Sequence, residues 1–223
     1  MSPTRRLLAA LEVGSLLIYP SSRHTDADDH ARKIIAIDVK QGQVAILERV
    51  AVRLSELAEA HPVRRLIPTG AVLVPVPRHT PQEPRSLWAA LQIARALHAA
   101  GIGHSIAPLL ERTEPVRRST GARSAADREA PARHFETIHS DTALGFVDAD
   151  RPYVLVDDVV TTGSTLIACA SRLHALAPGA RITAFAVARA ERFISLHLVS
   201  EMLAPLVETI RLQGDDARPQ RGR

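Results

Sequence analysis

Blocks of apolar residues with two different spacings alternate along the chain and predict strands and helices in turn. Residues 71–76, 154–156 and 182–188 are short apolar runs rich in β-branched residues, typical of strands buried on both faces of a sheet. Residues 87–99 and 164–177 instead have apolar positions at helical spacing. This alternation predicts an α/β fold with a mostly parallel central sheet flanked by helices.

Before residue 71 and after residue 100 the pattern predicts less regular elements. Residues 16–19 predict a short strand, and the polar residues 20–30 follow it. Residues 34–38 predict a strand or a turn that leads into a helix over residues 43–57. Residues 106–110 predict one more strand. We therefore expect an N-terminal segment at 1–32 and the main domain at 33–213.

Three polar segments contain few large apolar residues. Residues 111–139 carry six arginines and predict a mobile loop. Residues 214–223 predict a disordered basic tail. The third segment is an acidic cluster for which a metal site and a solvated turn are both open, formed by Asp26, Asp28, Asp29 and His30.

Composition narrows the classes of ligand. Aromatic residues are only 3% of the chain, which disfavours a single-stranded nucleic-acid site built from stacked rings. The net charge of +4 suits an anionic ligand and also weak nucleic-acid binding. The single cysteine, Cys169, excludes an intramolecular disulfide and a cysteine-based zinc site. No apolar run resembles a secretory signal or a membrane span, so we expect a cytoplasmic protein without a membrane partner.

Residues 153–165 combine an apolar run, an acidic pair and a hydroxyl-rich loop. Asp157 and Asp158 follow the apolar run, and a helical pattern begins after the loop formed by Thr161, Thr162, Gly163, Ser164 and Thr165. Backbone N–H groups and the dipole at a helix N-terminus bind anions. Carboxylates beside them suit ribose hydroxyls, directly or through Mg²⁺. The motif predicts a site for a phosphorylated ribose; the simpler alternative is that these side chains only cap a turn and a helix.

This stretch resembles the phosphoribosyl pyrophosphate (PRPP) motif of the type I phosphoribosyltransferases. The resemblance implies that Asp157 and Asp158 are the catalytic residues that bind the ribose hydroxyls and Mg²⁺, and that the loop from Thr161 to Thr165 holds the 5-phosphate. Val74-Pro75-Val76-Pro77 and the basic residue after it look like the first core strand and pyrophosphate loop of the branch close to the competence protein ComF. That likeness implies PRPP contacts from Arg78 and His79.

The Arg-rich segment adds candidate ligands for pyrophosphate. By the same resemblance, Arg112 follows a strand end, and Arg117 and Arg118 lie on a loop that closes over the site, where guanidinium groups pair with phosphate oxygens. For the loop arginines a solvated basic loop is the open alternative. Two features depart from the family. The four-cysteine zinc module of ComF proteins is replaced by residues 15–30, and Thr161 stands where 6-oxopurine enzymes carry an acidic residue, which argues against hypoxanthine or guanine as the acceptor.

The resemblance implies an enzyme of nucleotide metabolism that transfers the phosphoribosyl group of PRPP to a nitrogen acceptor and releases pyrophosphate. Residues 1–32 would then be the hood over the acceptor, and a homodimer fits the family. Two other classes stay open. One is a regulator that senses PRPP or nucleotides without catalysis and binds nucleic acid, which the basic tail favours. The other is a ComF-like accessory protein in DNA uptake or processing.

Overall fold

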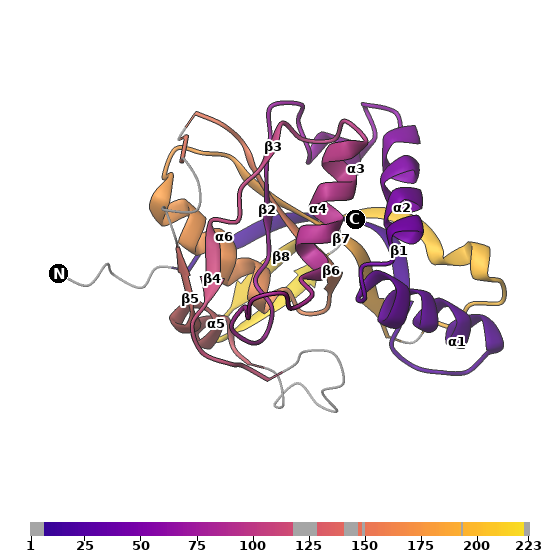
Figure 1. The fold of residues 1–223 in the computed structure, drawn as a ribbon. Helices are drawn as coiled ribbons and strands as arrows, with labels where there is room; N and C mark the ends of the chain where they lie inside the picture. The colour runs from indigo at the N-terminus through magenta and orange to yellow at the C-terminus, as the bar shows by residue number, and fades with distance from the viewer. Residues whose placement is uncertain (1–6, 118–128, 141–146, 149, 193, 221–223) are drawn as a thin grey trace.

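Figure 1 shows the fold in a computed structural model, which describes residues 7–117, 129–140, 147–148, 150–192 and 194–220. Its centre is a seven-stranded sheet in the order β3-β2-β6-β7-β1-β8-β9. In chain order these strands are β1 (Ala10–Pro20), β2 (Val72–Pro75), β3 (Ser105–Ile106), β6 (Tyr153–Val160), β7 (Ile182–Glu191), β8 (Leu203–Gln213) and β9 (Asp216–Gln220). The strands from β3 to β1 pair in parallel, whereas β8 pairs antiparallel with both β1 and β9. The predicted α/β class with a mostly parallel sheet is confirmed.

Helices cover both faces of the sheet, and the sheet separates two apolar cores. One core lies under α1 (Asp26–Lys33), the π-helical η1 (Ile34–Val39), α2 (Val44–Glu56), α3 (Pro62–Arg65) and α4 (Ala89–Ala99). The other lies under α5 (Pro131–Thr137), α6 (Ser164–Leu176) and a small sheet of β4 (Leu110–Arg112) and β5 (Ile138–Ser140). In Figure 1, α1 and α2 lie on the opposite side of the molecule from α5 and α6.

Side chains of β6 alternate between these two cores. Val154 and Val156 pack in the first core, and Tyr153 and Leu155 pack in the second. Both faces of the strand are therefore buried, which is why its sequence is apolar without interruption. The strands expected at 71–76 and 182–188 and the helices expected at 87–99 and 164–177 are likewise confirmed, as β2, β7, α4 and α6.

The N-terminal residues belong to the main sheet, which corrects the expected boundary after residue 32. β1 is longer than the strand expected at 16–19 and lies between β7 and β8, hydrogen-bonded to both. Its side chains supply Leu11 and Val13 to one core and Leu16 to the other. Residues 34–38 also differ from expectation, because they continue α1 as the π-helical η1 instead of forming a strand or a turn.

Of the acidic cluster near residue 28, only Asp28 is buried, and it caps α1, whereas Asp26, Asp29 and His30 are exposed. Thr25 accepts a hydrogen bond from the Asp28 N–H at 3.0 Å, and the Asp28 carboxylate accepts bonds from the backbone N–H groups of His24, Thr25 and Leu196. Asp28 is fully buried, so it is neither part of a solvated turn nor open to a cation. Within the described ranges, no group of three metal-ligating side chains occurs.

Two segments expected to lack regular structure are partly ordered. Residues 216–220 form β9, and Ala217 packs into the core beside α6. In the Arg-rich segment, α5 and β5 form because Phe135 and Ile138 reach the same core, while residues 118–128 lie outside the described part of the chain. In both cases the pairing or burial of a few residues outweighs a polar composition. None of the described helices has the length and apolarity needed to cross a bilayer.

Candidate functional site

A cleft of about 500 Å³ opens at the carboxyl ends of β2 and β6. This is the edge where ligands bind in parallel sheets. The sequence-predicted site residues that line it are Arg78, His79, Arg112, Arg117, Asp157, Asp158, Thr161, Thr162, Gly163, Ser164 and Thr165. The remaining candidate, Arg118, lies outside the described residues. The fold thus brings together side chains from four separate stretches of sequence.

The acidic pair faces the cleft because β6 loses one of its two neighbours at this point. β2 pairs with β6 only as far as Val156, and the chain then turns away through Arg78 and His79. β6 itself continues to Val160 along β7. Asp157 and Asp158 therefore lie within the strand, whereas the sequence pattern had placed them after its end.

The two carboxylates have different surroundings. Asp158 Oδ2 lies 2.5 Å from Lys40 Nζ, the cation at the end of η1. The other oxygen of Asp158 accepts the Val159 N–H at 2.6 Å. Burial, and after it the charge of Asp158, raise the pKa of Asp157 to about 8, so Asp157 holds a proton when the cleft is empty near neutral pH.

The hydroxyl loop has the geometry of an anion site. Gly163, the N-cap of α6, has φ of 86°, and the hydroxyls of Thr162 and Ser164 lie 3.0 Å apart. A side chain at Gly163 would overlap Ile210 of β8, so the loop rests directly on that strand. α6 is thirteen residues long, and its N-terminal N–H groups and dipole point to the loop. Within the cleft, this is the place best suited to a phosphate.

Arg112, expected to contact the ligand, lines the cleft, and each of its three guanidinium nitrogens also contacts a protein group. It is 3% exposed, its Nε donates to the Arg78 carbonyl at 2.5 Å and its Nη1 donates to Thr137 Oγ1 at 2.7 Å. Its Nη2 lies 3.3 Å from His134 Nδ1. Burial lowers the pKa of Arg112. Arg112 therefore fixes the turn at Arg78 in place, while Arg78, His79 and Arg117 keep side chains on the cleft.

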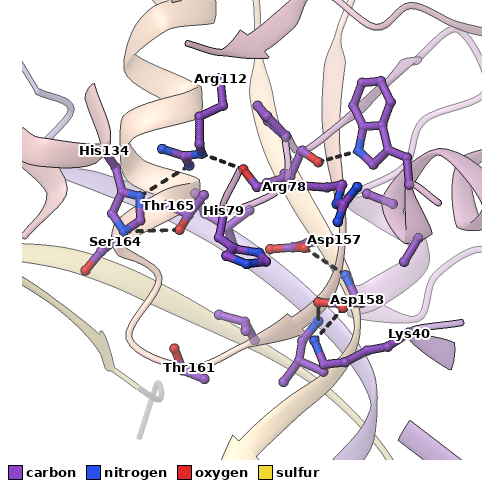
Figure 2. Close-up of a pocket in the computed structure, with 18 of the residues that line it drawn as sticks. Lys40, Arg78, His79, Arg112, His134, Asp157, Asp158, Thr161, Ser164 and Thr165 are labelled. Carbon is purple, nitrogen blue, oxygen red and sulfur yellow. Dashed lines mark hydrogen bonds and ion pairs between the residues drawn. The ribbon is translucent and has the colours of Figure 1, made fainter. Parts of the chain in front are cut away.

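Among the lining residues that were not predicted from the sequence, three have polar side chains with hydrogen-bond partners: Lys40, Trp88 and His134. The Trp88 indole N–H donates to the Val76 carbonyl at 2.7 Å, which holds its ring against the cleft. Lys40 comes from η1 and His134 from α5, elements that the sequence pattern did not predict. Only Trp88 had a signal, as the single tryptophan in an aromatic-poor chain. Figure 2 shows Lys40 and the acidic pair on one side of the cleft and His134, Ser164 and Thr165 on the other.

The cleft combines donors for an anion with acceptors for hydroxyl groups. Lys40, Arg78 and Arg117 give the cleft positive charge, and the two aspartates supply carboxylate oxygens. Carboxylate oxygens coordinate Mg²⁺ together with the phosphate oxygens of a ligand. The residues present therefore fit Mg²⁺ as a partner of a bound polyphosphate.

In comparisons with known proteins, no family model and no curated protein matches this chain.

Proposed function

We propose that the cleft binds PRPP and that the protein transfers the phosphoribosyl group to a nitrogen acceptor, with release of pyrophosphate. The observation that carries this proposal is the meeting of the acidic pair, the hydroxyl loop at 161–165 and the turn at Arg78 in one cleft. A helix N-terminus suits a phosphate monoester, carboxylates suit a sugar diol, and a basic turn suits pyrophosphate. PRPP has these three groups in one molecule.

Each part of the cleft would have one task. The loop at 161–165 would hold the 5-phosphate, and Asp157 and Asp158 would accept hydrogen bonds from the ribose hydroxyls. Arg78 and His79 would face the pyrophosphate. When bound, Mg²⁺ supplies positive charge to the pyrophosphate, and Asp157 and Asp158 are the residues that would hold it.

The reaction would replace one bond at the ribosyl carbon by another. The acceptor nitrogen forms a bond to this carbon while the bond to pyrophosphate oxygen breaks, and pyrophosphate leaves with the electron pair. The proton of the acceptor nitrogen passes to solvent. Positive charge develops on the sugar ring during this step, beside the two carboxylates, which favours the transition state over the bound substrate.

The flank of the cleft between η1 and α4 would receive the acceptor. Ala36, Leu87 and Trp88 line this flank, and Lys40 and Gln41 border it. The fixed indole of Trp88 offers an aromatic surface, and such surfaces pack favourably with planar rings. An acceptor with a nitrogen-containing planar ring fits this chemistry.

Binding is tested by thermal unfolding with Mg²⁺ and PRPP. A ligand at one hundred times its Kd adds about 2.7 kcal/mol of stability, which raises Tm by about 5–10 °C in a chain of this size. Asp158→Asn should remove most of that ligand-induced shift, whatever it does to the starting Tm. Glu56→Gln is the control, because it removes an exposed carboxylate of α2. An equal shift in both variants would contradict the assignment of the acidic pair.

Catalysis is tested separately, by pyrophosphate release in the presence of PRPP and a panel of nitrogen heterocycles and amines. Turnover with one acceptor, lost in Asp158→Asn, supports the transferase. PRPP binding without turnover across the panel, together with salt-dependent DNA binding, would favour the non-catalytic regulator.

A further inference from the structure

His134 is a buried histidine that connects two parts of the cleft. It belongs to α5 and is 2% exposed. Its Nδ1 lies 3.3 Å from Arg112 Nη2, and its Nε2 lies 3.4 Å from Thr165 Oγ1. Figure 2 shows the ring between these two side chains. Arg112 in turn donates to the Arg78 carbonyl, so a continuous chain of polar contacts runs from the turn at Arg78 to the hydroxyl loop.

The direction of these hydrogen bonds follows from the chemistry of the partners. A guanidinium group has only donors, so His134 Nδ1 must accept from Arg112. A neutral imidazole that accepts at Nδ1 carries its proton on Nε2, and that proton points to the Thr165 hydroxyl oxygen. Burial and the charge of Arg112 lower the pKa of His134 to about 3, which keeps the ring neutral at physiological pH.

The contact determines what Thr165 can offer to a ligand. When its oxygen accepts from His134, the hydroxyl proton is left to point elsewhere, and Thr165 lines the cleft in the first turn of α6. We propose that His134 is a positioning residue that fixes the Thr165 hydroxyl as a hydrogen-bond donor to the phosphate of the ligand. This inference rests on the proposed function, since it needs a phosphate in the loop.

Orientation before binding is the physical advantage of such an arrangement. A free hydroxyl rotor loses freedom when it must donate to an anion, whereas one held by His134 is already aligned. Arg112 holds His134 in turn, because its guanidinium is anchored by the Arg78 carbonyl and by Thr137. The two loops of the cleft are therefore kept in one relative position by these two buried side chains.

The test is a double-mutant cycle read by calorimetric titration with ribose 5-phosphate. We expect Thr165→Val and His134→Leu each to raise Kd by about tenfold, the size of a hydrogen bond to a charged group. If His134 acts through Thr165, the double variant binds no more weakly than Thr165→Val alone. His134→Gln should restore most of the affinity, because its amide accepts from Arg112 and donates to Thr165. His98→Leu, at an exposed position of α4, is the control.

Additive losses in the double variant, or full affinity in His134→Leu, would overturn the positioning role while leaving the proposed function intact. If the unmodified protein binds no ribose 5-phosphate, the positioning role is overturned, while the proposed function is decided by the thermal shift with Mg²⁺ and PRPP. The tautomer of His134 can be measured without a ligand or a variant. ¹⁵N NMR of the histidine rings should show His134 protonated at Nε2. A proton on Nδ1 would contradict the inference.

Discussion

At the scale of single residues, the two adjacent aspartates show how surroundings separate identical groups. Asp158 has a cation in contact, because Lys40 Nζ lies 2.5 Å away. Asp157 accepts the Asp158 N–H at 2.9 Å, yet its burial and the neighbouring charge raise its pKa to about 8. A bound cation or sugar diol would lower the pKa of Asp157 again, because either one stabilises the ionised carboxylate.

The raised pKa predicts how the empty protein responds to pH. The unfolded carboxyl ionises near 3.8, whereas the folded one keeps its proton to about 8, so the native state binds more protons between these values. Asp157 therefore makes the free energy of unfolding fall as pH rises through that window. Asp157→Asn removes this loss, and its stability relative to the unmodified protein should be greater at about pH 8.5 than at about pH 5.

Urea unfolding at the two pH values measures this difference. Glu56→Gln serves as the control, and its relative stability should not change with pH in the same way, because Glu56 is exposed. A constant difference between Asp157→Asn and the unmodified protein would show that Asp157 ionises normally in the folded state.

At the scale of elements, the hydroxyl loop depends on a strand far away in sequence. Gly163 adopts a left-handed conformation with φ of 86°, and Ile210 of β8 fills the space where a side chain would be. Ile210 is fully buried. β8 thus supports the start of α6 from below and sets the position of the loop relative to the sheet.

Gly163→Ala should be strongly destabilising for two separable reasons. The left-handed backbone costs about 1–2 kcal/mol for a residue with a side chain, and overpacking against Ile210 adds about 1–3 kcal/mol. In an Ile210→Ala background, only the backbone part should remain, so the same substitution would cost about 1–2 kcal/mol. Denaturant unfolding of the four proteins measures both parts.

Gly70→Ala is the matched control, because no atom lies within 4 Å of the added Cβ. Its free energy of unfolding should change by less than about 1 kcal/mol. If Gly163→Ala is as mild as the control, the loop does not rest on β8 as described.

At the scale of the whole molecule, β1 brings the N-terminal part of the chain into the sheet beside the C-terminal strand β8. It lies between the parallel part of the sheet, through β7, and the antiparallel part, through β8. Both apolar cores contain its side chains. Removal of β1 would therefore leave β7 and β8 each without one of its two partners and open both cores at once.

A fragment that begins at residue 33 should consequently fail to fold. We expect it to show no cooperative thermal transition by circular dichroism, while the full chain unfolds in one transition seen equally by circular dichroism and by the fluorescence of Trp88. A soluble 33–223 fragment with a cooperative transition would contradict the placement of β1 and restore the boundary expected from the sequence.

Local patterns were sufficient for the features whose parts are close together along the chain. The apolar runs of β2, β6 and β7 and the helical spacing of α4 and α6 were predicted because each element carries its own signal. Asp157, Asp158 and the loop at 161–165 line the same cleft, as expected for residues that are close together in sequence.

Only the tertiary structure decided what meets these residues. Lys40 pairs with Asp158 across 118 positions of sequence, and His134 reaches Thr165 across 31. The placement of β1 and β9 depends on hydrogen bonds to distant strands, so an unremarkable N-terminal stretch and a polar tail became parts of the sheet. Backbone pairing and burial are set by partners far along the chain, whereas periodicity and motif order are set by the residues themselves.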